Sequence, residues 1–374
     1  MKPVWHIYYG TRGTAGSYID ALVKASVKAG LKVKAFVSSR YTYNTPYCSK
    51  CFFPITDHSE TRNKLIIILR GIELIFAYLY IAISALFLRP KVVIHLIDDL
   101  KITYYLFLFF KMIQLPVYIT CHDIQSQYYG MTSIRTIMMS KADKLLVHNK
   151  NAKITLLNKI GESAEEKINI YPFPFSSYDQ ILNSKRMQLC YTNRHNIIPS
   201  DKPYYLALGV VRMSKGIETL LQAWSMSKLK HQAQLIIAGK WTDPPAEIRR
   251  MAENEPSCTV IDKYISDEEY VSLIEHSKFV ILPYLDYIHS AVLFSCGYHG
   301  GAVINSDIEL FKETMPDYPL TFETGNNIAL AELLDRTIEM NREEVEKYKK
   351  LTCQAIELQQ DGLTEQLQAV YTEN

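Results

Sequence analysis

Two cations lie between two glycines in the stretch GVVRMSKG, residues 209–216. Arg212 offers a planar fork of donors and Lys215 a compact ammonium, and both groups match the oxygens of a diphosphate. Such a pair also stabilises the negative charge that grows on a diphosphate when it departs as a leaving group. The alternative is a loop whose two cations are merely solvated, so the position of the stretch in the fold decides its chemistry.

The neighbours of this stretch place it at the end of a strand. Residues 204–208, YYLAL, are typical of a buried strand, and apolar side chains recur at helical spacing from Ile217 to Trp224. Ligands of parallel sheets bind beyond the carboxyl ends of the strands. We therefore expect Arg212 and Lys215 to point from such an end toward a ligand.

Two further strand ends carry residues that suit a ligand. The loop GTRGTAGS holds Gly13 and Gly16 ahead of a helix, which permits close approach of a phosphate or a sugar hydroxyl but also suits a plain tight turn. Its glycine spacing differs from GxGxxG, which excludes a dinucleotide fingerprint. His122 and Asp123 follow the strand PVYIT, where a neutral imidazole can hydrogen-bond a sugar hydroxyl or serve a structural role.

The elements that carry these loops alternate along the chain. Helical patterns separate the strand-like runs VWHIYY, KVKAFVS, VVIHLI and PVYIT, and the same order restarts with YYLALG, QLIIAG and FVILPY. This alternation predicts an α/β fold of two doubly wound, Rossmann-like domains that face a central cleft. We expect the first domain at residues 1–178, the second at 200–355, and a C-terminal helix at 356–374 that packs back on the first. Ser266 and Glu269 predict a capping box in the second domain.

The stretch GVVRMSKGIETLLQAW resembles the GxxRxxKGxxxLLxA stretch of GT-B glycosyltransferases, especially the retaining enzymes of family four. The blocks RPKVVIHLID, PVYITCHDI, KADKLLVHN, QLIIAGK and GGAVINSD fall in the order of that family, so the resemblance covers nearly the whole chain. It implies that Arg212 and Lys215 hold the diphosphate of a nucleotide sugar, with Gly209 in the same donor loop. It also implies that His122 lies beside the transferred sugar.

The same resemblance assigns the first glycine-rich loop. The segment from Gly13 to Gly16 is expected to close over the donor phosphate and the acceptor, with Ser17 and Asp123 on the acceptor side. One part of the family pattern is absent. Members usually carry two glutamates eight residues apart after a PS or PY pair, the first beside the sugar and the second on the ribose.

In ILPYLDYIHSAVLFSC those two places fall on Tyr287 and Ser295, which we expect to contact the donor without a carboxylate. The segment HSAVL is similar to the SGVL variant of some members, in which backbone amides at a helix N-terminus face the diphosphate. This likeness assigns Ser290, Ala291 and Val292 to donor binding.

Composition limits the partners. The chain has 374 residues, 48% of them hydrophobic, and a formal net charge of +2, so it can bury sizeable cores but offers no field of one sign for nucleic acid. Its seven scattered cysteines favour a reducing cytoplasm. Cys48, Cys51 and His58 are close in sequence but lack a fourth ligand at a workable spacing, so we expect no metal and no cofactor.

The most apolar stretch runs from Leu65 to Leu88 and is interrupted by Arg70 and Glu73. The uninterrupted piece is shorter than the roughly 20 residues that a spanning helix needs. A core helix, a core helix that also touches a bilayer, and a true span all stay open. Six basic residues lie within or beside the stretch: Arg62, Lys64, Arg70, Arg89, Lys91 and Lys101. They favour an anionic bilayer, so we expect a cytoplasmic protein, peripheral on the inner face of the plasma membrane.

These features predict transfer of a sugar from a nucleotide-sugar donor to a glycan or lipid-linked glycan, with retention if the family mechanism holds, in bacterial surface polysaccharide synthesis. The reaction needs no metal if cations and helix amides stabilise the departing diphosphate. Two alternatives stay open. One is a sugar-nucleotide epimerase of the same fold, and the other is a catalytically silent binding partner, which Tyr287 and Ser295 motivate because neither is a carboxylate.

Overall fold

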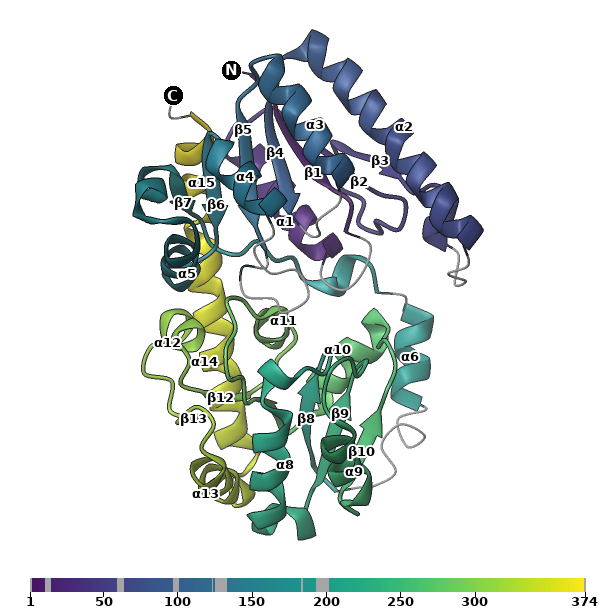
Figure 1. Cartoon of the computed structure of the whole chain (residues 1–374). Helices are drawn as coiled ribbons and strands as arrows, with labels where there is room; N and C mark the ends of the chain where they lie inside the picture. Colours follow the sequence, from purple (N-terminus) through teal and green to yellow (C-terminus); the bar gives the residue numbers. More distant parts are fainter. Residues whose placement is uncertain are drawn as a thin grey trace. The chain divides into compact units, whose positions relative to one another are not determined.

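The computed structural model describes residues 2–10, 15–58, 64–96, 101–122, 124, 133–182, 184–192 and 202–372. The chain divides into two compact units (Figure 1). Unit 1 comprises Met1–Ser176 and Gln360–Asn374, and unit 2 comprises Ser177–Gln359. Each unit contains one parallel sheet with helices on its faces, so the expected α/β fold with two doubly wound sheets is confirmed.

The sheet of unit 1 has seven strands in the order β3-β2-β1-β4-β5-β6-β7. Their bounds are β1 Val4–Tyr8, β2 Val33–Ser38, β3 Cys48–Phe52, β4 Lys91–Leu96, β5 Val117–Cys121, β6 Lys144–Val147 and β7 Ile168–Ile170. All of the strand pairs are parallel. The central strands are buried along their length, as expected for near-continuous apolar runs covered on both faces.

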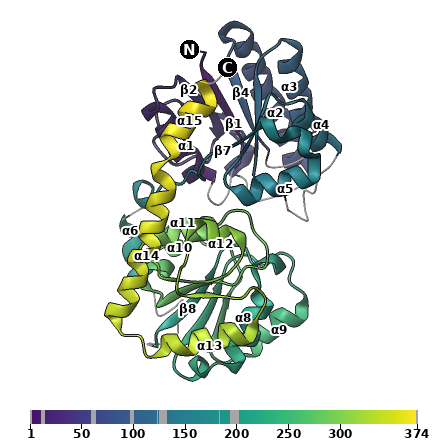
Figure 2. The ribbon, with the colours of Figure 1, turned by 90° about the vertical axis from the view of Figure 1, so that its left-hand side faces the viewer.

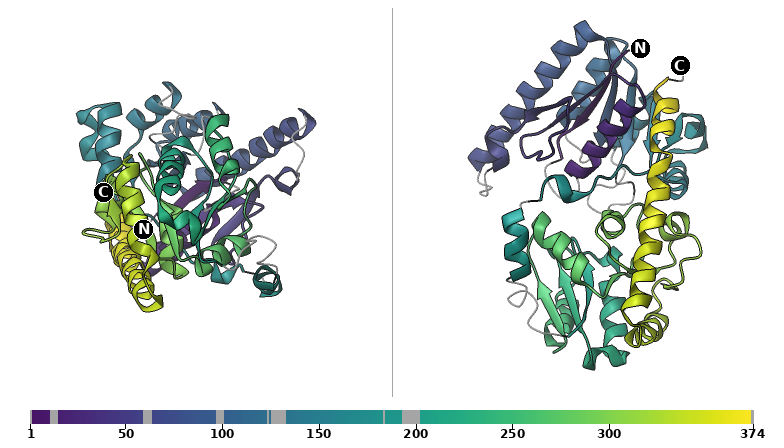
Figure 3. Two further views of the ribbon diagram at one scale, coloured as in Figure 1. Left: turned by 90° about the horizontal axis from the view of Figure 1, so that it is seen from below. Right: turned by 180° about the vertical axis from the view of Figure 1, so that it is seen from behind.

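The helices of unit 1 are α1 Ala15–Lys28, α2 Lys64–Leu88, α3 Lys101–Met112, α4 Ser133–Lys141, α5 Lys150–Ile160 and α15 Leu363–Thr372, with 3₁₀ turns η1 Thr56–His58 and η2 Glu162–Lys167. The last helix, α15, lies beside α1 although the two are far apart in sequence (Figures 2 and 3). Its carbonyls at Tyr371 and Val370 accept hydrogen bonds from Lys91 Nζ (2.7 Å) and Lys144 Nζ (2.9 Å). The end of the chain is thus part of unit 1.

The sheet of unit 2 has six strands in the order β10-β9-β8-β11-β12-β13. Their bounds are β8 Tyr204–Leu208, β9 Gln234–Ala238, β10 Cys258–Ile261, β11 Phe279–Leu282, β12 Val303–Ser306 and β13 Thr321–Phe322. The helices are α6 Ser184–Thr192, α8 Ile217–Met226, α9 Ala246–Asn254, α10 Asp267–His276, α11 Ala291–Tyr298, α12 Glu309–Thr314, α13 Asn327–Ile338 and α14 Arg342–Asp361. Every paired strand in this sheet is also parallel.

Local signals in unit 2 behave as the sequence predicts. The capping box of α10 is confirmed, because Ser266 Oγ accepts from the Glu269 amide while Glu269 accepts from the Ser266 amide. At the start of α8, Gly216 adopts a left-handed φ of 66°. A Cβ at this position would lie 1.8 Å from the carbonyl oxygen of Pro283, so only glycine permits this close approach between the β8 turn and the segment after β11.

The long apolar helix α2 is not a core helix. Only 22% of its membrane-length apolar segment is buried. By length and composition α2 is the one helix among the described residues that could cross a membrane. It lies on the outside of unit 1, against α3 and β3 (Figure 1). Composition alone could not distinguish this arrangement from a buried helix, because both are equally apolar.

Candidate active site

The ammonium of Lys215 is buried at the carboxyl end of β8. The side chain is 8% exposed, and Lys215 closes the 3₁₀ turn η4 (Met213–Lys215). Among the described residues, the hydrogen-bond acceptor recorded for its Nζ is the carbonyl oxygen of Leu208, at 3.5 Å. Burial, and then the nearby charge of Arg212, lowers the pKa of Lys215 to about 7. An anionic ligand would strongly stabilise the charged form of a lysine that is buried in this way.

Gly209 makes room for this ammonium. It follows β8 with a φ of 96°, and a Cβ there would lie 3.0 Å from Lys215 Nζ and 3.4 Å from Val292 Cγ2. The glycine therefore brings the strand end, the lysine and the first turn of α11 to one place. The ring centroids of Tyr284 and Tyr287 lie 5.4 and 5.9 Å from the same Nζ, which adds two aromatic faces to the site.

The loop that carries Arg212 is fixed by backbone contacts. Arg212 precedes η4, and the amide of Met213 donates to Asp243 Oδ1 at 2.8 Å. The carbonyl of Ser214 accepts from the amide of Leu285 at 2.9 Å. Arg212 is half-buried and close enough to Lys215 for its charge to affect the pKa of the lysine. The two cations predicted from GVVRMSKG thus share one rigid turn.

The N-terminus of α11 supplies backbone amides to the same region. Ser290 is the N-cap, and its Oγ accepts from the amide of Leu293 at 3.2 Å and contacts Tyr284 Oη at 3.4 Å. Ala291 and Val292 occupy the first turn, where helix amides have no intrahelical acceptor. The positive end of a helix at this place suits an anion.

The two residues at the missing glutamate positions differ in placement. Tyr287 is half-buried beside Lys215 and packs on Tyr284, with ring centroids 5.1 Å apart. Ser295 is fully buried, and its hydroxyl donates to the carbonyl of Ala291 at 2.9 Å, inside α11. The structure therefore brings Tyr287 together with Lys215, whereas the Ser295 hydroxyl is engaged within its own helix.

The candidate residues of unit 1 form a separate group. His122 follows β5 and is half-buried. It belongs to a chain of three hydrogen-bonded imidazoles: His6 Nδ1 and His95 Nε2 are 3.1 Å apart, and His95 Nδ1 and His122 Nε2 are 3.0 Å apart. Each ring nitrogen in these contacts must be a donor where its partner is an acceptor. The tautomer of His122 is therefore coupled to the tautomers of the two buried rings.

Burial opposes a positive charge on the two inner rings of this chain, His6 and His95. It lowers the pKa of His6 to about 3. Burial, followed by the neighbouring His122, holds the pKa of His95 well below its ordinary value. Tyr18 closes the group on one side, since its hydroxyl contacts His148 Nε2 at 3.3 Å and Tyr171 Oη at 2.9 Å. These rings form a polar cluster toward the carboxyl end of the sheet, in which burial lowers the pKa of His6 and His95.

Sequence reasoning missed His6, His95 and His148. The signal was a histidine within or just after each of three strand-like runs, in VWHIYY, VVIHLI and KLLVHN. Without the order β1-β4-β5-β6 nothing in the sequence shows that these strand ends are neighbours.

The remaining candidates of unit 1 are Gly13 and Gly16, expected in the loop over the donor phosphate and the acceptor, and Ser17 and Asp123, expected on the acceptor side. Ser17 is 1% exposed, and its Oγ donates to the carbonyl of Ser176 and accepts from the amide of that residue, at 2.5 and 2.9 Å. Gly16 packs close to Tyr43, whose ring would lie 3.2 Å from an added Cβ. Gly13 and Asp123 lie outside the described residues. The functional roles of these four residues stay predictions.

Within the described ranges, no group of three or more histidine, cysteine, aspartate or glutamate side chains could hold a metal ion. The expectation of a metal-free and cofactor-free site stays a prediction.

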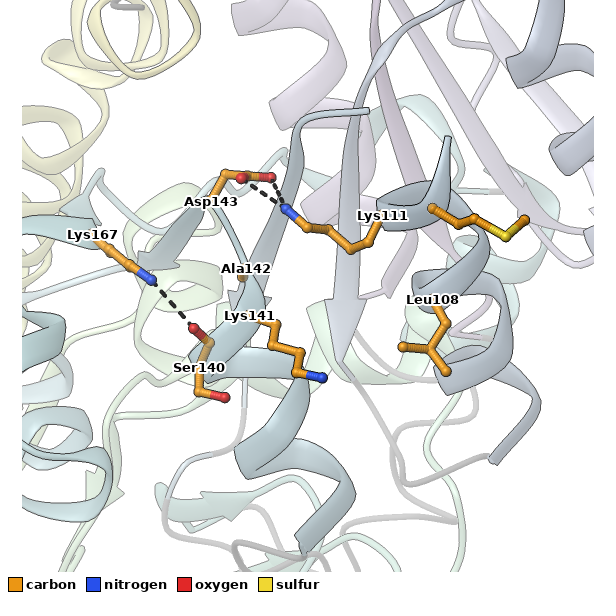
Figure 4. A pocket seen from close by; sticks show the side chains of 8 residues that line it. Leu108, Lys111, Ser140, Lys141, Ala142, Asp143 and Lys167 are labelled. Carbon is orange, nitrogen blue, oxygen red and sulfur yellow. Dashed lines mark hydrogen bonds and ion pairs between the residues drawn. The ribbon is translucent and has the colours of Figure 1, made fainter. Parts of the chain in front are cut away.

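A surface pocket of unit 1 lies away from the strand ends discussed above. Its lining comes from α3, the end of α4 and the segments before β6 and β7 (Figure 4). Lys111 Nζ forms an ion pair with Asp143 at 2.8 Å, and Lys167 Nζ donates to the carbonyl of Ser140 at 3.2 Å. Parallel sheets bind ligands at the carboxyl ends of strands, and this pocket lies at the opposite end of β6. We therefore do not place the active site there.

Comparisons with known proteins agree with the fold. The family model described as glycosyl transferases group 1 matches residues 192–357. No curated protein sequence matches the chain. A glycosyltransferase structure from Rickettsia africae is 16% identical with a TM-score of 0.66, over 100% of this chain and 99% of that chain.

Two further solved structures are similar over nearly the whole chain. Sucrose-phosphate synthase from Thermosynechococcus elongatus is 15% identical with a TM-score of 0.63, covering 99% of this chain and 97% of that one. An E. coli structure described as trehalose-6-phosphate bound with UDP-2-fluoro glucose is 12% identical with a TM-score of 0.63, covering 97% of each chain. At these identities the likeness shows the fold, which is of the GT-B class.

Proposed function

We propose that the protein is a glycosyltransferase that moves a sugar from a nucleotide-sugar donor to a hydroxyl of a glycan or lipid-linked glycan in bacterial surface polysaccharide synthesis. The observation that carries the proposal is the buried Lys215 ammonium at the end of β8, beside Gly209 and the N-terminus of α11. This group lies within the segment that matches the glycosyl transferase family model. The descriptions of two similar structures name a glycosyltransferase and a bound UDP-2-fluoro glucose, which supports a nucleotide sugar as the donor.

The proposed chemistry balances without an additional reagent. The acceptor oxygen forms a bond to the anomeric carbon, and the bond from that carbon to the diphosphate oxygen breaks with its electron pair on the diphosphate. The acceptor proton passes to the departing oxygen. Lys215, Arg212 and the amides of α11 stabilise the charge that develops there, so no carboxylate base is needed for cleavage. On this route the anomeric configuration is retained.

The substitutions at the glutamate positions affect donor selection. A carboxylate binds sugar or ribose hydroxyls through charge-assisted hydrogen bonds, whereas Tyr287 offers one phenol and an aromatic face. We therefore expect the donor sugar to be held by fewer polar contacts and more by stacking. His122, at the end of the histidine chain, is proposed to hydrogen-bond the transferred sugar.

A donor screen followed by a turnover assay tests the proposal. Nucleotide sugars are first ranked by the rise in melting temperature that they cause, because a ligand that binds the native state stabilises it. The best donor is then incubated with candidate acceptors, and release of nucleoside diphosphate is measured. Release that depends on both donor and acceptor supports sugar transfer. Release without an acceptor indicates an epimerase or a hydrolase, and donor binding without any release indicates a silent binding protein.

A further inference from the structure

Helix α2 exposes an apolar face along its whole length. The exposed side chains recur every three or four residues, which places them on one side of the helix: Leu65, Ile68, Ile72, Ile75, Phe76, Leu79, Ile83, Leu86 and Phe87. Their exposed fractions run from 43% for Ile72 to 81% for Phe87. Soluble proteins rarely leave so long a contiguous apolar stripe in water, so this face requires an occupant. We call these nine residues the α2 face.

The opposite side of the same helix is anchored to unit 1. Its buried residues are Leu74, Ala77, Tyr78, Ile81 and Ala85. The hydroxyl of Tyr78 shares a 2.9 Å hydrogen bond with Thr103 of α3. A helix that crossed a bilayer would have to leave these contacts, whereas a helix lying on its surface keeps them.

The two charges inside the helix sequence do not interrupt the α2 face. Glu73 accepts hydrogen bonds from the amides of Ile55 (2.6 Å) and Thr56 (3.3 Å), and so caps the preceding turn. Arg70 lies over the ring of Phe53, 3.6 Å from its centroid, and pairs with Asp57 at 3.5 Å. Both side chains are therefore directed to their own unit, and the face itself carries no charge.

Among the described residues that flank α2 in sequence, the exposed charges are positive. Lys64 at its start and Arg89 just after its end are exposed, and Lys34 Nζ lies 3.4 Å from the hydroxyl of Tyr80 on the flank of the helix. Among the described residues from 46 to 112 the acids are Asp57 and Glu73, and both are engaged as above. An apolar face with cations at both ends complements an anionic lipid surface.

We propose that unit 1 docks on an anionic bilayer through the α2 face, with α2 lying in the plane of the interface. The apolar side chains enter the acyl boundary, and Lys64, Arg89 and Lys34 contact lipid headgroups. A second copy of the chain is a poorer occupant, because pairing two such helices in an antiparallel arrangement would bring Lys64 of one copy toward Arg89 of the other.

Docking on a bilayer also limits the class of acceptor in the proposed function. If the protein is a glycosyltransferase, an enzyme held at the lipid surface meets lipid-linked acceptors in preference to soluble ones. That step rests on the proposed sugar transfer, whereas the docking itself does not. Vesicle binding and turnover are therefore measured separately, and each can fail without the other.

Flotation with vesicles is the direct test. The full chain is mixed with vesicles of phosphatidylcholine alone or with vesicles that also contain about 30% phosphatidylglycerol, whose anionic headgroups give the surface a negative potential. We expect the protein to float with the anionic vesicles, with weaker binding at high salt. A chain that stays in the soluble fraction with both vesicle types would overturn the proposal.

Paired variants assign the binding to the helix. Phe76→Glu with Ile83→Glu changes two side chains that are 67% and 56% exposed, so the fold should tolerate it. We expect vesicle binding to fall about tenfold or more. The matched control changes two apolar side chains of similar exposure elsewhere, Ile154→Glu in α5 (58%) and Ile328→Glu in α13 (61%), and should bind as the parent does. Equal loss in both pairs would contradict a role for the α2 face.

Two further measurements distinguish docking on the bilayer surface from a helix that spans the bilayer and from a dimer. Alkaline carbonate should release the bound protein from vesicles, and retention would mean that α2 spans the bilayer instead of lying in its plane. Light scattering in the absence of lipid should give the monomer mass for the parent and for Phe76→Glu/Ile83→Glu. A dimer that only the α2 variant disrupts would mean that a second copy covers this face.

Discussion

Arg212 is the residue whose substitution most directly tests the leaving-group role. Its guanidinium lies on the same turn as Lys215 and would contact the departing diphosphate. We expect Arg212→Ala to lower turnover roughly a hundredfold, which corresponds to about 3 kcal/mol for one lost donor to a developing charge. Steady-state kinetics with the best donor measures this effect. Arg250→Ala, at a 67% exposed position of the same unit, is the control and should be near normal. Near-normal turnover of Arg212→Ala would reject the assigned role.

Lys215 predicts how binding depends on pH. Its pKa of about 7 in the free protein means that the side chain is largely neutral at pH 8. A bound diphosphate favours the charged form and raises this pKa, so binding at pH 8 takes up close to one proton, while binding at pH 6 takes up little. Affinity should therefore fall as pH rises above 7, by up to about tenfold per unit.

Calorimetry in buffers with different ionisation heats measures this proton uptake, with a nucleoside diphosphate as the ligand. At pH 8 the terminal phosphate is already fully ionised, since its second pKa is about 6, so it does not contribute. Lys215→Met should abolish the uptake and flatten the affinity profile. An unchanged profile in this variant would show that another group binds the proton.

At the scale of single elements, the turn between β8 and α8 depends on Gly216. An alanine there would place its Cβ 1.8 Å from the carbonyl oxygen of Pro283 and would also hold a left-handed φ of 66°. We expect Gly216→Ala to destabilise unit 2 by about 3 kcal/mol or more, because both backbone segments must shift. Gly300 has the same φ but no atom within 4 Å of an added Cβ, so Gly300→Ala should cost only about 1 kcal/mol. Denaturant unfolding of the two variants measures the difference, and equal losses would show that the contact with Pro283 is not limiting.

Features that depend on local sequence, such as this turn, could be predicted, whereas features that depend on the order of strands could not. A glycine-flanked strand end followed by helical spacing is a local signal, and so is the capping box of Ser266 and Glu269; the strand-to-helix turn and the cap could be predicted for that reason. The histidine chain was hidden, because His6, His95 and His122 become neighbours only through the order of three strands. The exposure of α2 was hidden too, since an apolar helix has the same composition in a core and on a membrane-facing surface.

At the scale of the whole chain, unit 1 is completed by its last fifteen residues. The chain leaves unit 1 at Ser176 and returns to it at Gln360, whose side chain donates to the carbonyl of Phe173 at 2.8 Å. The helix α15 then buries Leu363, Leu367, Val370 and Tyr371. Unit 1 therefore needs α15 to complete its core, whereas unit 2 is complete at Gln359.

A chain that ends at Gln359 should be destabilised in one unit only. Loss of four buried side chains, and of the carbonyl acceptors for Lys91 and Lys144, should cost unit 1 more than about 5 kcal/mol. Hydrogen exchange should then accelerate in β1 and β4 and stay unchanged in β8 and β9. Leu367→Asp should reproduce a smaller version of this pattern, and Gln366→Asp, at the neighbouring exposed position, should not. Faster exchange in both sheets of the truncated chain would mean that the two units do not fold independently, because damage confined to the core of unit 1 would then have spread to unit 2.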